Sequence, residues 1–133
     1  MIYPYLNFNG NTREAIAFYA SVFDLQDPQI MTFGEGPQVP PEMKDWVMHA
    51  QLIINGTRVM FSDAMINDPV DLGNNLSLMM IHEDAALLET WFNRLSVGAE
   101  IWQPLQKTFF SPLYGSLKDK FGVVWQFNCE PKA

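Results

Sequence analysis

The spacing of apolar and polar side chains predicts two helices and a series of strands. In two segments the apolar residues recur three or four positions apart, as they do on one face of a helix. These predicted helices cover residues 12–23 and 83–96. Other segments show period-two alternation or runs of β-branched and aromatic residues, which are typical of strands. The predicted strands cover residues 1–9, 28–33, 46–54, 57–63, 75–81, 99–105, 114–118 and 123–127.

Turn signals join several of these strands. Asn55-Gly56 is a strong two-residue hairpin signal between two of them. Residues 119–122 indicate a second hairpin, in which Gly122 closes the turn at a position that requires a positive φ. Residues 34–45 hold three prolines and two glycines, so we expect a long irregular loop that can cover a cavity. Residues 64–74 form a polar connector.

Both predicted helices carry end signals. Asn11 and Glu14 are expected to form a capping box at the start of the first helix. Gly98 stands where the C′ residue of the second helix belongs. The expected buried stripe of the first helix is Ala15, Phe18 or Tyr19, and Val22. The expected buried stripe of the second helix is Leu88, Trp91, Phe92 and Leu95.

The predicted elements repeat. Each half of the chain has the order strand, helix and three strands, so the sequence predicts an α+β fold of two βαβββ modules. Residues 2–9 and the first helix match the second half at an offset of 73, whereas the hairpins that close the two halves match at an offset of 66. We therefore expect a single domain, 1–133, made of modules 1–66 and 67–133.

Composition narrows the class of protein. Apolar residues make up 48% of the chain and charged residues 17%, which is typical of a globular protein. Cys129 is the single cysteine, so no internal disulfide is expected. We expect the protein to work in the reducing environment of the cytoplasm. No apolar run approaches the length of a membrane span. The net charge of −7 argues against nucleic acid and suits a neutral or cationic small ligand.

Seven stretches together carry a resemblance to a known family: YPYLNF at 3–8, EAIAFY at 14–19, HA at 49–50, SDA at 62–64, PLQKTFF at 104–110, YGS at 114–116 and DKFGVVW at 119–125. They resemble the PhnB-like family of the glyoxalase, or vicinal-oxygen-chelate, superfamily, some of whose members are described as demethylubiquinone methyltransferases. The resemblance implies half-barrel modules around a cleft and a homodimer. Family members usually carry Phe-Trp where this chain has Phe109-Phe110. The chain shows no glycine-rich loop followed by an acidic residue, the signature of a nucleotide cofactor.

The resemblance also implies where a metal would bind, because metal-using members take ligands from the first and last strands of each module. Divalent metals prefer imidazole, carboxylate or thiolate ligands, and Gln126 is the only weak ligand among the implied positions. We therefore predict that the usual metal is absent and that no other cofactor is bound. The implied positions are Tyr3 or Pro4, Leu76 or Ser77, Met60, and Gln126.

A small-molecule site is expected, because apolar walls with a few polar groups are typical of ligand cavities. His49 and Gln51 share a strand face, and His49 and Asp63 could act as a proton-handling pair if they touch. The predicted ligand-binding residues are Tyr5, Asn7, His49, Gln51, Asp63, Trp102, Phe110, Tyr114, Trp125 and Gln126.

Three interpretations of function remain open at this point. The first is a metal-free binder of a small molecule. The second is a metal-dependent lyase, isomerase or dioxygenase with a non-standard ligand set that includes His49, such as His49, Asp63 and Gln126. The third is a purely structural or interaction module. Hydrolase chemistry is not expected, because no serine has the context of an activated nucleophile.

Overall fold

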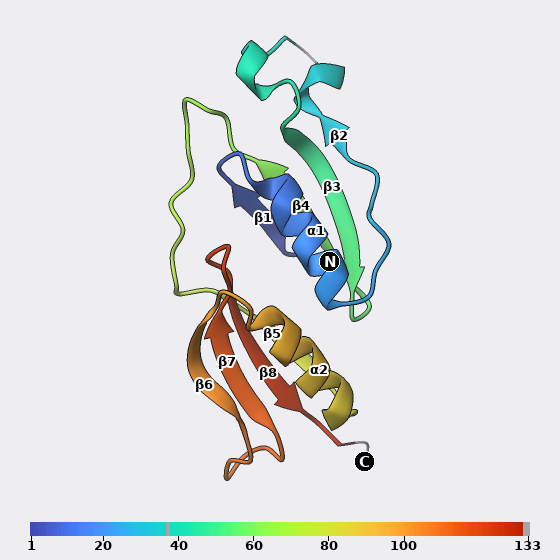
Figure 1. Ribbon diagram of the computed structural model, residues 1–133, viewed down its shortest axis with the longest axis vertical. Helices are drawn as coiled ribbons and strands as arrows, with labels where there is room; N and C mark the ends of the chain where they lie inside the picture. The colour runs from blue at the N-terminus through green and yellow to red at the C-terminus, as the bar shows by residue number, and fades with distance from the viewer. Residues whose placement is uncertain (37, 132–133) are drawn as a thin grey trace. The chain divides into compact units, whose positions relative to one another are not determined.

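The computed structural model describes residues 1–36 and 38–131, and the chain divides into two compact units (Figure 1). The first module, Met1–Asp71, contains β1 (Tyr5–Phe8), α1 (Thr12–Val22), β2 (Met31–Thr32), β3 (Val47–Ile54) and β4 (Thr57–Asp63). The second module begins at Leu72 and contains β5 (Ser77–His82), α2 (Ala85–Leu95), β6 (Glu100–Gln106), β7 (Tyr114–Lys118) and β8 (Val124–Cys129).

The two modules have the same topology, which confirms the predicted α+β fold and its repeat. Their strand orders are β1-β4-β3-β2 and β5-β8-β7-β6. In each module the first strand runs parallel to the last, and the other neighbours are antiparallel. One helix covers one face of each sheet: α1 packs on β3 and β4, and α2 packs on β8 and β5 (Figure 1). We call the opposite side of each sheet its open face.

The core of each module lies between the helix and the sheet. Tyr19 of α1 is fully buried and stacks on Phe61 of β4, with ring centroids 5.9 Å apart. In the second module, Phe92 of α2 meets Phe127 of β8 edge-on at 5.3 Å. The buried residues of α2 are the predicted stripe, Leu88, Trp91, Phe92 and Leu95. In α1 the buried residues are Thr12, Ala15, Ile16, Tyr19, Ala20 and Val22, so Tyr19 rather than Phe18 faces the core.

The predicted turns are confirmed in their backbone angles. Asn55 and Gly56 both have positive φ, 48° and 83°, as a two-residue hairpin turn with the twist of its strands requires. Gly122 has φ 89° and its N–H donates to the Asp119 carbonyl at 2.9 Å. Gly98 also has a positive φ, 74°, but the C-cap of α2 is Ser96, so Gly98 lies one position beyond the predicted C′ residue.

Some predicted bounds were wrong. β1 begins at Tyr5 instead of residue 1, and β2 has only two residues, Met31–Thr32, instead of six. The loop predicted over 34–45 contains short 3₁₀ helices at Phe33–Glu35 and Pro41–Met43. The first N–H group of a helical turn has no partner within the turn, so a proline at that position loses no hydrogen bond. The Pro-rich sequence therefore still permits one turn. Pro37 lies outside the described residues.

The capping box predicted at Asn11 was also wrong. Asn11 makes no side-chain cap hydrogen bond. Instead the Asp63 carboxylate, at the end of β4, accepts from the N–H groups of Gly10 and Thr12 at 2.9 and 3.1 Å, and from the Thr12 hydroxyl at 2.6 Å. A residue far along the chain therefore accepts from the first free N–H group of α1, that of Thr12, and from the turn that precedes the helix.

The modules differ by one residue before the helix. The helices span 12–22 and 85–95, an offset of 73. In the first strands the offset is 74, because Tyr5 pairs with Met60 and its equivalent Met79 pairs with Gln126, the equivalent of Met60. Three residues connect β1 to α1, and two connect β5 to α2. The single offset of 73 predicted for strand and helix together therefore holds for the helices alone. Among the described residues, no helix has the length and apolar character needed to cross a membrane.

Candidate ligand-binding site

A cavity of about 380 Å³ opens on the second module. The segment before β5 supplies two asparagines, and the four strands supply the remaining walls because their open-face side chains converge there. Val124 and Ser116 are buried at its base, 4% and 6% exposed. The lining residues are Asn74, Asn75, Ser77, Trp102, Gln103, Tyr114, Ser116, Val124 and Gln126.

A chain of hydrogen bonds crosses three strands of this cavity. The Tyr114 hydroxyl on β7 donates to Gln126 Oε1 on β8 at 2.6 Å. Gln126 Nε2 donates to Ser77 Oγ on β5 at 2.8 Å. The amide is thus held at both ends, and its second N–H and the Ser77 hydroxyl proton remain available for other acceptors. A fixed row of donors and acceptors of this kind can orient a polar ligand.

The cavity is polar without being charged. Its lining contains amides, hydroxyls and one indole, and none of its nine residues is an acid or a base. Burying a charged ligand against neutral groups costs free energy unless the charge is paired. The chemistry of this lining therefore favours a neutral ligand that offers hydrogen bonds, and the net charge of the whole chain has no counterpart here.

Of the other residues predicted in this half, one lies beside the cavity and one lies in the core. The Phe110 ring meets Tyr114 edge-on at 5.1 Å and is 58% exposed. Trp125 was predicted to line the cavity, but it lies on the helix face of β8, 2% exposed, where its indole donates to Asp119 Oδ2 at 2.9 Å. Alternation along β8 places Trp125 and Gln126 on opposite sides of the sheet.

In the first module, four predicted residues share the open face of the sheet. The Tyr5 hydroxyl and His49 Nδ1 share a hydrogen bond of 3.1 Å. The Ser62 hydroxyl donates to Asn7 Oδ1 at 2.8 Å. Gln51 pairs in register with Met60 on the same face. This face presents polar groups as well, but the position equivalent to Gln126 is occupied by the thioether of Met60.

Asp63 lies on the other face, so the predicted pair of His49 and Asp63 was wrong. Asp63 is 4% exposed and its Oδ2 accepts from the Val47 N–H at 2.9 Å, while its Oδ1 caps α1. Both oxygens are committed to backbone donors. For the same reason the non-standard metal set of His49, Asp63 and Gln126 cannot assemble as predicted.

The donor groups do not fit the metal that the superfamily resemblance implies. The last-strand positions are a methionine and a glutamine, and Gln126 already bonds Tyr114 and Ser77. Within residues 1–36 and 38–131, no three His, Cys, Asp or Glu side chains come together in a way that could hold a metal ion. A site of neutral amides and hydroxyls is a poor match for a divalent transition metal.

Several cavity residues escaped the sequence-based prediction. Ser116 was considered only as a nucleophile, and Ser77 only as a nucleophile or an implied metal position. Asn74, Asn75 and Gln103 were not considered. One signal was available: a hairpin joined at 119–122 places Ser116 opposite Gln126, as the register shows. The asparagines had no such signal, because they reach the cavity from a connector.

Comparison with known proteins identifies several similar chains. The model of a family described as 3-demethylubiquinone-9 3-methyltransferase matches residues 1–128. Protein PA1353 from Pseudomonas aeruginosa is 34% identical, with a TM-score of 0.88 over 99% of this chain and 98% of that one. The PhnB protein from Bacillus cereus is 31% identical, with a TM-score of 0.80 over 97% and 98%. The fosfomycin resistance protein FosX from Listeria monocytogenes shares the fold, with a TM-score of 0.62 at 9% identity over 96% and 88%.

Proposed function

The chain belongs to the 3-demethylubiquinone-9 3-methyltransferase family, the PhnB-like branch of the glyoxalase superfamily, and from that membership we propose that it binds a neutral small molecule in the cavity of its second module without the usual metal. The observation that carries the proposal is the hydrogen-bonded chain from Tyr114 through Gln126 to Ser77. Two of these residues, Ser77 and Gln126, stand on the first and last strands, where metal-using relatives are expected to hold their ion.

The neutral lining supports the choice of ligand. The amide of Gln126 can donate one further hydrogen bond, and the side chains of Asn74 and Asn75 offer both donors and acceptors. Trp102, 42% exposed, supplies an aromatic surface beside them. A ring or planar amide that stacks on the indole while bonding the amides would satisfy both features.

The methyltransferase description of the family receives no support from the residues at the strand-to-helix turns. A nucleotide-type cofactor would need free backbone N–H groups in a glycine-rich turn at a helix start. In the first module the Gly10 N–H is already bound to Asp63, at 2.9 Å. In the second, the turn consists of Glu83 and Asp84. These residues do not fit such a cofactor, so no methyl-transfer step is assigned.

A charge series of isosteric fragments tests the proposal. Thermal-shift measurements would compare benzamide, benzamidinium and benzoate, because a compound that binds only the folded state raises the unfolding midpoint. We expect benzamide to raise the midpoint most. The Gln126→Met variant, which gives the second module the residue of the first, should lose this response, whereas Gln51→Met on the open face of the first module should keep it.

Three outcomes would contradict the proposal. A response to benzamidinium with none to benzamide would overturn the neutral ligand. A benzamide response that survives in Gln126→Met would place binding elsewhere. One stoichiometric metal per subunit, in protein purified without chelators or a metal-affinity tag, would overturn metal-free binding.

We further propose that the protein works as a homodimer in the cytoplasm. The open face of the second sheet exposes Met79 and Ile81 of β5, and Trp102 of β6 is also exposed. Apolar groups gathered in this way commonly mark interaction surfaces. Gel filtration at twice the chain mass of 15.2 kDa is the expected result, and a clean monomer at micromolar concentration would contradict it.

A further inference from the structure

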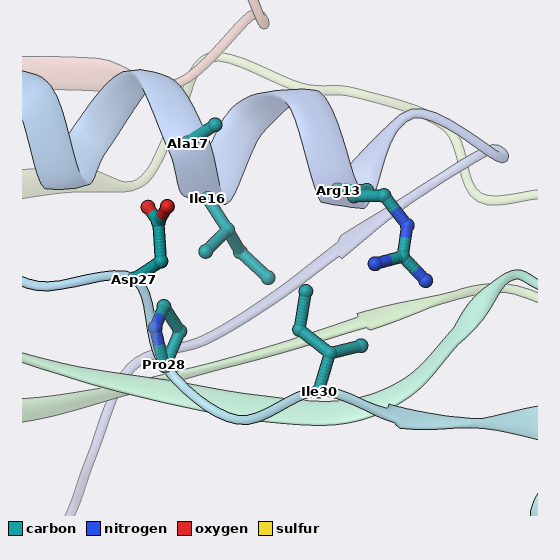
Figure 2. A pocket seen from close by; sticks show the side chains of 6 residues that line it. All are labelled: Arg13, Ile16, Ala17, Asp27, Pro28 and Ile30. Carbon is teal, nitrogen blue, oxygen red and sulfur yellow. The ribbon is translucent and has the colours of Figure 1, made fainter.

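A groove of about 410 Å³ lies on the helix side of the first module, away from the open face of that sheet. It runs between α1 and the segment that leads from α1 to β2 (Figure 2). Figure 2 shows the side chains of Ile16 and Ile30 pointing toward one another across it, with Arg13 at one end and Asp27 at the other. Its lining residues are Arg13, Ile16, Ala17, Asp27, Pro28 and Ile30.

The groove is built from a regular helix face and a restrained connector. Arg13, Ile16 and Ala17 are spaced i, i+3 and i+4, so they lie on one side of α1. Ile16 is 1% exposed and therefore forms a firm apolar floor. Pro28 has a fixed φ and restricts the backbone beside Asp27. Both walls are thus largely set before any ligand arrives.

The guanidinium of Arg13 is positioned without being neutralised. Its Nη2 donates to the backbone carbonyl of Asp45 at 2.9 Å, which fixes the side chain while leaving its positive charge and its other donors. A guanidinium with free donors matches a carboxylate in a two-point contact. This end of the groove suits an anionic group.

The two ends of the groove carry opposite charges, and the helix reinforces the positive end. Arg13 lies in the first turn of α1, at the positive end of the helix dipole. At the other end, the Asp27 carboxylate lies beside Ile16 and Ala17 in the middle of α1, so it supplies a negative charge without help from the helix (Figure 2). One end of the groove therefore attracts an anion and the other a cation, with apolar side chains between.

We propose that this groove binds a zwitterion of dipeptide length, with its carboxylate at Arg13, its ammonium group at Asp27 and apolar side chains against Ile16 and Ile30. The four steps along the helix from Arg13 to Ala17 rise about 6 Å, and two extended residues span about 7 Å. A single α-amino acid carries both charges on one carbon and is too short. This site is independent of the cavity in the second module.

The probe for a direct test is leucyl-leucine, titrated into the full-length protein by two-dimensional NMR. We expect saturable shifts at residues 13–17 and 27–30, with weak affinity because both charged groups are exposed to water. Arg13→Gln and Asp27→Asn should each weaken binding by about three- to fivefold, as for exposed ion pairs. Asp68→Asn and Lys107→Gln serve as charge-matched controls and should leave the affinity unchanged.

Blocked probes assign each end of the ligand. N-acetyl-leucyl-leucine lacks the ammonium group, so its affinity should remain sensitive to Arg13→Gln and become insensitive to Asp27→Asn. Leucyl-leucine amide lacks the carboxylate and should show the reverse pattern. The proposal would be overturned if no saturable shifts appeared at these residues up to about 10 mM peptide, because the dissociation constant would then be well above the millimolar range. So would binding that neither substitution weakens, or blocked probes that keep the sensitivity they should lose.

Discussion

Asp63 and Cys129 end the corresponding strands of the two modules, yet only Asp63 caps the helix of its module. Asp63 pairs with Phe8 and accepts four hydrogen bonds from groups around α1 and β3. Cys129 pairs with His82 and makes one weak S–H contact to the Glu83 carbonyl at 3.6 Å. The second module caps α2 locally, because Asp84 Oδ1 accepts from the Leu87 N–H at 3.1 Å.

The comparison shows that two modules with the same backbone topology can cap their helices with different side chains. In the first module a buried carboxylate joins the first strand, the helix and β3 at a single point. In the second, a surface aspartate serves the helix alone and a small apolar residue fills the buried position. We infer that the first module depends more strongly on one side chain than the second does.

The sharpest way to break this comparison is Asp63→Ala. The substitution leaves the N–H groups of Gly10, Thr12 and Val47 without their acceptor, at about 1–3 kcal/mol for each one that stays buried and unsatisfied. After partial relaxation we expect the free energy of unfolding to fall by about 3–5 kcal/mol, measured by urea denaturation. The matched Cys129→Ala change should cost at most about 2 kcal/mol. Equal losses in the two variants would refute the asymmetry.

The second test concerns the position that faces the helix on the neighbouring strand. Gly115 pairs with Phe127 as Ala50 pairs with Phe61. A methyl group on Gly115 would stand 3.0 Å from both Phe92 Cε2 and Leu105 Cδ2. Overpacking of this kind costs about 1–3 kcal/mol, so we expect Gly115→Ala to lower the unfolding free energy by that amount.

The reciprocal variant provides the control for this position. Ala50→Gly removes a methyl group from a strand that accommodates it, and it should cost about 0.5–1 kcal/mol through chain entropy. Thermal unfolding of both variants gives the comparison. A stabilised Gly115→Ala protein would show that α2 can move away from its sheet.

The smallest expected change in stability comes from substituting the residues that precede the two helices, Asp84 and Asn11. Asp84→Ala should cost about 1 kcal/mol, the usual value for a lost N-cap. Asn11→Ala should change stability by less than about 0.5 kcal/mol, because Asn11 makes no side-chain cap bond. Chemical denaturation of the two variants checks the order. A larger loss in Asn11→Ala would mean that Asp63 is not the cap of α1.

Much of the fold could be predicted because its signals are local. The stripe of α2 follows from a three-to-four spacing, and the hairpin at Asn55-Gly56 follows from residues that tolerate positive φ. The role of Asp63 could not be predicted in this way, since Gly10 and Thr12 lie more than 50 positions earlier in the chain. A local motif at Asn11 was therefore the wrong choice.

Part of the candidate site could have been predicted more accurately from the same signals. A two-residue turn pairs Ile54 with Thr57, as observed, and counting outward places His49 opposite Ser62 rather than beside Asp63. Likewise, alternation separates Trp125 from Gln126. The cavity itself could not be predicted, because it depends on where the connector places Asn74 and Asn75.

The burial of Cys129 has a practical consequence for following the molecule in time. It is the only cysteine in the chain and is 5% exposed beneath the end of β8. A thiol reagent can reach it only when that part of the second module opens, so the labelling rate reports local opening without any engineered probe. The native chain thus carries its own probe of opening in the second module, and labelling rates can be compared among all the variants above that keep Cys129.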